Sequence, residues 1–124
     1  MNILDALRSL SHDLPTKAWL KRMSEETEEG KASPFTAENI RAAAQVLKKF
    51  IGTLEVAVAK RKVSQVQGAI KKTVVTFNKL NPKNNYFIET LEREELVDFM
   101  IKAVRLTGFK VEEDADITES WREW

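Results

Sequence analysis

Four carboxylates are grouped at Glu92, Glu94, Glu95 and Asp98, where a spacing of three and four residues puts neighbouring side chains on one face of a helix. Their oxygen atoms are the type of ligand that a hard divalent cation prefers. The same residues also begin a predicted helix, where the helix dipole stabilises negative charge. We prefer this second interpretation, a solvated start of a helix, and expect no metal there.

The other residues that could do chemistry are isolated from one another. His12 is the only histidine, and no carboxylate lies three or four residues before it, so the Glu-x-x-His motif of di-metal bundles is missing. The four glycines are scattered and form no phosphate-binding loop, and no Gly-x-Ser-x-Gly elbow is present. Without cysteine, the chain has no disulfide, thiol nucleophile or cysteine-based zinc site. We therefore expect no enzyme, no metal and no cofactor.

Charge is distributed unevenly along the chain. Its 124 residues contain 20 Lys and Arg against 19 Asp and Glu, which gives a net charge of +1. Residues 37–83 hold ten of the basic residues and only two acidic ones, so this segment carries +8 and the rest of the chain −7. The basic clusters are Lys48, Lys49, Lys60, Arg61, Lys62, Lys71 and Lys72.

Two interpretations of this basic segment stay open. If exposed, it would attract an acidic protein surface or the phosphates of a nucleic acid. If it packs against the acidic flanks of its own fold, its charge is neutralised internally. Phe50 and Phe77, the aromatic residues near the clusters, fall on predicted apolar stripes. The stacking platform typical of single-strand binders is therefore not expected.

The N-terminal part of the chain predicts two helices. Apolar residues at helical spacing predict a first helix that begins after Asn2 and ends before Pro15, and Thr16 is the expected N-cap of the second. Carboxylates at 25, 26, 28 and 29 would oppose the dipole at the end of that second helix. They predict a mobile acidic loop over residues 25–33.

The centre of the chain predicts a long helical hairpin. Thr36 is the expected N-cap of a helix over residues 37–60, with Phe35 and Ile40 at the spacing of a hydrophobic staple, and Ser64 is the expected N-cap of a helix over 64–80. Alternating residues leave helix and strand both open over 53–60. A break near residues 60–63 is expected because one helix over 37–80 would be about 66 Å long, which is too long for a compact domain of this size.

The C-terminal third predicts one more long helix. Asparagine and proline over residues 78–85 predict a turn. Thr90 is the expected N-cap of a helix over 90–107 with apolar residues on two sides, and Gly108 fits its left-handed C-terminal cap. Residues 115–124, which contain Trp121 and Trp124, are expected to dock on the other helices. The whole chain, 1–124, thus predicts a mainly α, single-domain bundle of about five or six helices.

Two segments of this third carry a resemblance. Residues 87–96 have the sequence FIETLEREEL, and residues 116–124 have the sequence DITESWREW. Together they resemble a family of small bacterial proteins that has no assigned activity, over residues 80–124. The resemblance implies a helical fold and points to Glu89, Thr90, Arg93, Glu94, Trp121, Arg122 and Trp124 as motif residues. Physically, Arg93 or Arg122 would bridge to carboxylates of the terminal segment and lock the last helix to the tryptophans.

The expected function is therefore that of a non-catalytic protein-interaction protein, an immunity or adaptor protein of bacterial type that acts through a charged helical face. The immunity role rests on analogy with other small bacterial proteins. The alternative is a nucleic-acid-associated protein that uses the basic hairpin. No signal peptide or membrane span is visible, so a cytoplasmic location and no membrane partner are expected. Long apolar faces leave self-association open.

Overall fold

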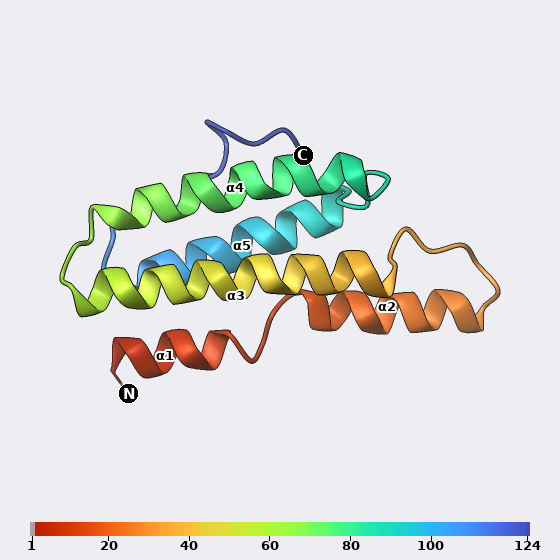
Figure 1. The fold of residues 1–124 in the computed structure, drawn as a ribbon, viewed down its shortest axis with the longest axis horizontal. Coiled ribbons are helices and arrows are strands. Elements are labelled where there is room, and N and C mark those ends of the chain that lie inside the picture. The colour runs from red at the N-terminus through yellow and green to blue at the C-terminus, as the bar shows by residue number, and fades with distance from the viewer. Residues whose placement is uncertain (1) are drawn as a thin grey trace.

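Five helices and no strand form in residues 2–124, the part of the chain that the computed structural model describes. They are α1 (Ile3–Leu10), α2 (Thr16–Glu28), α3 (Ala37–Ala59), α4 (Gln65–Lys83) and α5 (Thr90–Leu106). The helices pack as one mainly α domain (Figure 1), which confirms the predicted bundle. Within the described residues, no helix combines the length and the hydropathy needed to cross a bilayer.

The predicted hairpin is formed by α3 and α4, which lie side by side (Figure 1). Residues 53–59, for which the sequence left both helix and strand open, are helical. The chain turns at Arg61, whose φ of 55° is in the left-handed region. There the amide of Arg61 donates to the carbonyl of Val58 (3.0 Å) and that of Lys62 to the carbonyl of Ala57 (2.9 Å). These two bonds satisfy carbonyls at the end of α3.

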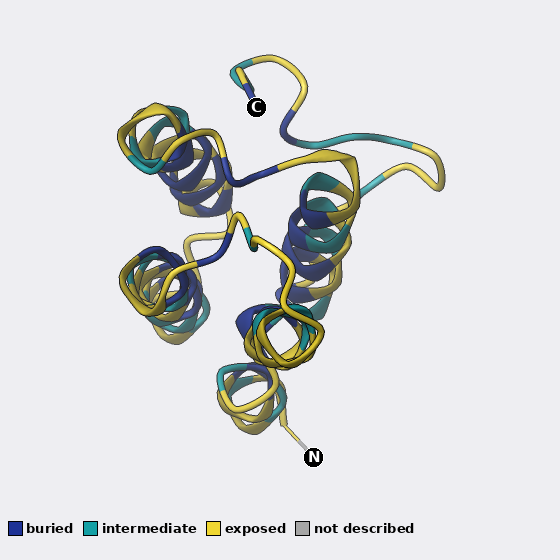
Figure 2. Cartoon of the chain, turned by 90° about the vertical axis from the view of Figure 1, so that its right-hand side faces the viewer, coloured by how far each residue is buried: buried dark blue, intermediate teal, exposed yellow. Residues whose placement is uncertain are grey.

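The core is centred on α3, which contacts each of the other four helices. Figure 2 shows that the buried residues lie on the sides of the helices that face one another. Each helix therefore contributes one apolar stripe to a shared interior. The largest fully buried side chains include Trp19, Phe50, Phe77 and Phe87.

Three predicted helix caps are confirmed. The side chain of Asn2 accepts a hydrogen bond from the amide of Asp5 (2.8 Å). Thr36 accepts from the amide of Asn39 (3.0 Å), and the Asn39 side chain accepts from the amide of Thr36 (2.9 Å), which makes a reciprocal capping box. Gly108 follows α5 with a φ of 89°.

Two predictions near the N-terminus are wrong. The first helix ends at Leu10 rather than just before Pro15, because the amides of His12 and Asp13 bond three residues back and form a tight turn. Thr16 is not an N-cap: Pro15 holds that position, and Thr16 is a buried first residue of α2 that makes no capping bond. The fixed φ of proline suits the start of a helix.

The predicted acidic loop is also wrong for residues 25–28, which belong to α2. The helix continues because its end is capped by the main chain. Gly30 has a φ of 73°, its amide bonds the carbonyl of Thr27 (3.0 Å), and the amide of Lys31 bonds that of Glu26 (2.8 Å). Lys31 also pairs with Glu29 at 2.9 Å, which offsets part of the unfavourable charge.

The second half of the hairpin differs from prediction at both ends. Ser64 precedes α4 but makes no side-chain capping bond. The helix runs on to Lys83 with Pro82 inside its last turn, where the missing N–H costs only one hydrogen bond. The predicted turn is therefore shorter, and it is held by Asn81, whose carbonyl accepts from Tyr86 (2.9 Å) and whose side chain accepts from the amide of Ile88 (2.9 Å).

The start of α5 is shifted by one residue from the prediction. Glu89 is the N-cap and Thr90 is the first helical residue. The amide of Glu89 donates to Oε1 of Glu92 (3.0 Å), which is the bond that the third helical residue of a capping box accepts from its N-cap.

Candidate functional site

The basic residues of the hairpin face solvent. All ten in residues 37–83 are exposed, and none forms an ion pair with a carboxylate of residues 2–124. They are Arg41, Lys48, Lys49, Lys60, Arg61, Lys62, Lys71, Lys72, Lys79 and Lys83. The acidic flanks of the chain therefore do not neutralise the hairpin within the fold.

We call Lys48, Lys49, Lys60, Arg61, Lys62, Lys71 and Lys72 the basic face. The structure brings its α3 and α4 clusters together, because Lys49 and Lys72 line the same narrow depression of about 80 Å³ between the two helices. Lys60, Arg61 and Lys62 lie apart from this depression, at the end of the hairpin. Eleven helical residues, or about 17 Å, separate Lys49 from Lys60.

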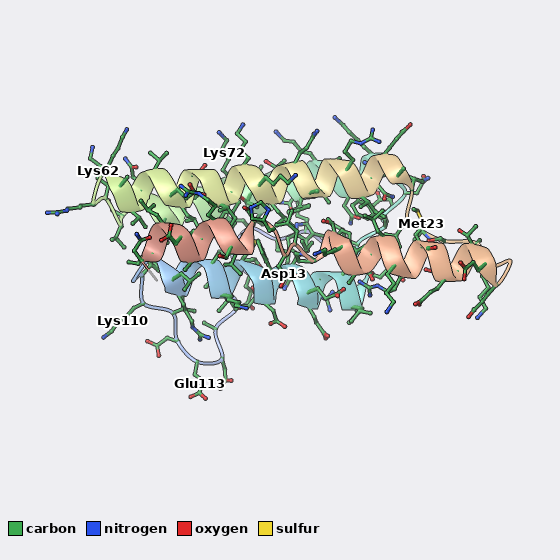
Figure 3. All side chains as sticks on the ribbon, turned by 90° about the horizontal axis from the view of Figure 1, so that it is seen from below. Asp13, Met23, Lys62, Lys72, Lys110 and Glu113 are labelled. Atoms are coloured by element: carbon green, nitrogen blue, oxygen red, sulfur yellow. The ribbon has the colours of Figure 1, made fainter. Side chains whose placement is uncertain are left out.

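Figure 3 shows Lys62 and Lys72 along one edge of the molecule and Glu113 on the opposite edge. Glu113 of the C-terminal loop thus lies away from the basic face. Phe50 and Phe77 are both buried beneath it, 1% and 0% exposed. Within the described residues, the basic face therefore presents cations without an aromatic platform.

The carboxylates at the start of α5 are not a uniformly solvated group, so the preferred interpretation is wrong for two of them. Glu92 is 6% exposed, and its Oε2 lies 3.3 Å from Nη1 of Arg22. Glu95 is half-buried and pairs with Nη2 of the same arginine, while the indole Nε1 of Trp19 donates to its Oε1 (3.2 Å). Arg22 compensates the cost of burying these charges.

The Arg22 cluster joins α2 to α5 across 70 residues of sequence. The Arg22 guanidinium also lies over the ring of Phe35, 5.7 Å from its centroid. Trp19 and Arg22 are three residues apart, as are Glu92 and Glu95, so each pair lies on one face of its helix. This matched spacing is the signal of the Arg22 cluster in the sequence, but it does not predict that α2 and α5 pack against each other. Across residues 2–124, no three His, Asp or Glu side chains are grouped so as to hold a metal ion.

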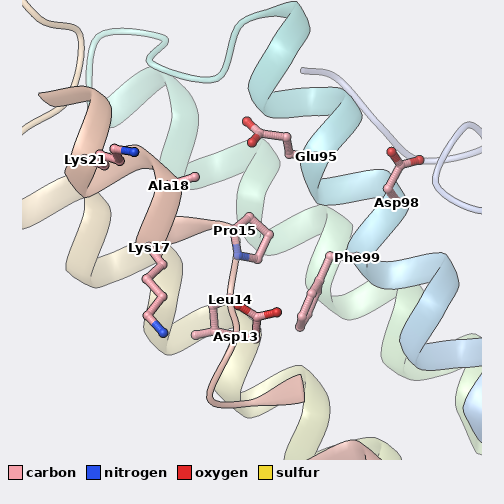
Figure 4. Close-up of a pocket in the computed structure, with 9 residues that line it drawn as sticks. All are labelled: Asp13, Leu14, Pro15, Lys17, Ala18, Lys21, Glu95, Asp98 and Phe99. Carbon is pink, nitrogen blue, oxygen red and sulfur yellow. The ribbon is translucent and has the colours of Figure 1, made fainter. Parts of the chain in front are cut away.

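A hollow of about 530 Å³ lies between the α1–α2 connection and α5 (Figure 4). Its wall mixes acidic residues, Asp13 and Asp98, with basic ones, Lys17 and Lys21. Glu95 also lines it but is engaged by Arg22 and Trp19. His12 is exposed and is not part of this wall. The hollow thus carries both charges, and its wall has no nucleophile paired with a base.

The tryptophans of the resembling motif lie against α4. Nδ2 of Asn78 donates to the carbonyl of Trp121 (2.8 Å), and the amide of Glu123 donates to Oδ1 of Asn78 (2.9 Å). Trp124 is buried and packs edge-on against Phe77, with centroids 5.8 Å apart. These contacts join the segment to α4, while Asp116 of the same segment lines a hollow together with Arg93 and Glu94 of α5.

Arg122 organises the C-terminal segment, residues 115–124. Its Nη2 pairs with Oδ2 of Asp116 (2.8 Å), its Nε donates to Oγ1 of Thr118 (3.0 Å), and its Nη1 donates to the carbonyl of Trp124 (2.7 Å). Partial burial acts to raise the pKa of Asp116, but hydrogen bonds from Thr118 and Arg122, together with the charge of Arg122, outweigh it and hold that pKa below its ordinary value. Arg122 thus makes the bridge predicted for one of the two arginines.

The remaining motif residues form no ion pair within residues 2–124. Arg93 is half-buried beside a hollow of about 270 Å³ that Glu94 and Asp116 also line, and no ion pair joins it to a described carboxylate. Glu89, Thr90 and Glu94 are exposed. The motif residues near Arg122 therefore hold the C-terminal segment together, whereas those at the start of α5 are mostly exposed.

Comparison of the chain with models of known protein families, with curated proteins and with solved structures finds no match. The resemblance of residues 80–124 to a small bacterial family stays a prediction. The functional argument therefore depends on the geometry of this molecule.

Proposed function

We propose that this chain is a non-catalytic interaction protein, of the immunity or adaptor type, whose basic face binds an acidic surface of a protein partner. The observation that carries the proposal is the set of ten exposed hairpin cations that pair with no carboxylate of residues 2–124. Charges left unpaired on one side of a molecule steer an oppositely charged partner toward that side.

The shape of the basic face suits a partner that lies along the hairpin. Lys48 and Lys60 mark its two ends along α3, twelve residues or about 18 Å apart. The depression between Lys49 and Lys72 lies within this length. An acidic helix or extended acidic segment that follows the hairpin would meet cations from both helices.

Apolar side chains beside the cations favour a protein partner over a nucleic acid. Val56 and Val63 are 48% and 39% exposed, on either side of the basic residues 60–62. Burial of such aliphatic groups against another protein favours binding, whereas a phosphate backbone offers little apolar surface for them to contact. The buried positions of Phe50 and Phe77 remove the stacking contacts that single strands use. A nucleic-acid-associated protein that binds duplex phosphates is the alternative.

The test is a binding titration at low salt with two labelled probes, a glutamate-rich peptide and a short DNA duplex. The test variant reverses the central cations: Lys48→Glu, Lys49→Glu, Lys71→Glu and Lys72→Glu. Exposed charge pairs each contribute about 0.2–1 kcal/mol, so reversing four lysines should weaken peptide binding by about tenfold.

The control reverses four exposed lysines outside the hairpin: Lys17→Glu, Lys21→Glu, Lys102→Glu and Lys110→Glu. It changes the net charge by the same amount and should keep most of the peptide binding. Equal losses in both variants would show that only net charge matters and would refute the proposal. Tight, salt-sensitive duplex binding with weak peptide binding would instead establish the alternative.

A further inference from the structure

Within residues 2–124, the four helices α2 to α5 each end with a residue in the left-handed conformation at the same capping position. Gly30 follows α2 with a φ of 73°, and Gly108 follows α5 with a φ of 89°. Asn85 follows α4 with a φ of 60°, and Arg61 follows α3 with a φ of 55°. Glycine adopts this conformation without cost, whereas a residue with a Cβ is strained there. Arginine thus stands where the other three helix ends have glycine or asparagine, the residues that tolerate this conformation.

The fold itself gains nothing visible from the arginine side chain. The two capping bonds, from the amides of Arg61 and Lys62, are main-chain bonds that glycine would make equally well. The Arg61 side chain is exposed, and within residues 2–124 it forms no ion pair. Strained residues of this kind are concentrated at sites that bind or switch.

The surroundings of Arg61 have the composition of a contact site. Lys60 and Lys62 are exposed on either side of it, and Val56 and Val63 supply exposed aliphatic surface nearby. The α3–α4 connection lies at one end of the molecule (Figure 1), where Lys62 projects from the hairpin in Figure 3. Residues 60–63 of this connection are all exposed, so a partner can reach them.

We propose that Arg61 is the anchor residue of the basic face, and that its guanidinium binds a carboxylate of the acidic protein partner. The inference rests on the proposed function and adds the residue and the chemistry of its contact. A guanidinium presents two parallel N–H groups that match a carboxylate, while lysine offers only a point charge. Arginine is also enriched among the few residues that dominate binding energy, with apolar neighbours that exclude water around it.

The inference predicts opposite changes in stability and in binding for one substitution. Arg61→Gly should raise the Tm by a few degrees, because it relieves the left-handed strain and keeps the main-chain cap. The same variant should bind the glutamate-rich peptide about tenfold more weakly, because a charge-assisted hydrogen bond is lost. A purely structural role for Arg61 would not separate the two measurements in this way.

Two further variants separate strain from side-chain chemistry. Arg61→Ala keeps the strain and removes the guanidinium, so it should lose binding without the gain in Tm. Arg61→Lys keeps the charge and should bind with intermediate affinity. Peptide binding by Arg61→Gly equal to wild type would overturn the inference, as would an unchanged or lower Tm. The four-lysine variant tests the proposed function separately. A failure of the inference about Arg61 can therefore be distinguished from a failure of the proposed function.

Discussion

The indole Nε1 of Trp124 donates a hydrogen bond of 3.3 Å to the carbonyl of Val74, 50 residues earlier in α4. The indole is buried at 8% exposure and packs edge-on against Phe77. The guanidinium of Arg122 lies over the same indole, 5.5 Å from its centroid. The last residue of the chain is thus part of the core, and the C-terminal segment contributes to the stability of the hairpin.

Trp124→Ala should therefore destabilise the protein by about 3 kcal/mol, because truncating a buried aromatic loses transfer free energy and leaves a cavity. Urea denaturation measures this loss. Trp121→Ala is the matched control. Trp121 is only half-buried, and its bond to Asn78 uses a main-chain carbonyl that alanine keeps. Equal losses for the two variants would contradict the assignment of Trp124 to the core.

Stability should fall at acid pH in a way that depends on Asp116. Its pKa is lowered in the folded state, so the carboxylate stabilises the fold above its unfolded pKa of about 3.9. That contribution is lost as the pH falls through the lower folded value. Asp116→Asn should thus be less stable than wild type at neutral pH, and the difference should shrink below about pH 4. Unfolding followed by tryptophan fluorescence across this range measures it.

Asp114→Asn provides the control for this pH experiment. Asp114 is exposed, and no ion pair joins it to a described cation. The substitution should change stability by less than about 0.5 kcal/mol at any pH. A pH dependence of Asp116→Asn that matches wild type would show that this carboxylate does not contribute.

Removing Arg22 should be costly, because it leaves the buried charge of Glu92 without a compensating cation. Arg22→Met should destabilise by about 3 kcal/mol, the loss typical of breaking a buried ion pair from one side. Arg22→Met combined with Glu92→Gln should lose less than the sum of the two single variants, since the uncompensated charge is then gone. Additive losses in urea denaturation would show that the two residues are not coupled.

Local signals in the sequence predicted much of the fold. The cap at Thr36, the glycine at 108 and the break after α3 each depend on residues within a few positions of one another, and all three are present. The sequence predicts too early an end for α2, because its carboxylates oppose the helix dipole there. The main-chain cap at Gly30 outweighs this effect. Helix dipole effects are small compared with satisfying the last carbonyls.

The candidate site was predicted less completely, for a different physical reason. The basic face follows from helical spacing, but its exposure depends on where the acidic flanks lie, which only the tertiary fold decides. The pairing of Arg22 with Glu92 joins residues 70 positions apart, and no local pattern encodes that register. The left-handed conformation of Arg61 has no marker either, because the sequence offers no glycine or asparagine there.

Substitution of the four glycines should divide them into two classes. An added Cβ would meet no atom within 4 Å at any of them, so steric contact does not decide the outcome. Gly30→Ala and Gly108→Ala should each destabilise by about 1 kcal/mol, because both positions have positive φ. Gly52→Ala lies inside α3 and should stabilise by about 0.5–1 kcal/mol, since alanine loses less backbone entropy in a helix. Thermal unfolding of the three variants measures the split, and a loss of stability in Gly52→Ala would contradict the unbroken helical geometry of α3 on which the hairpin and its basic face depend.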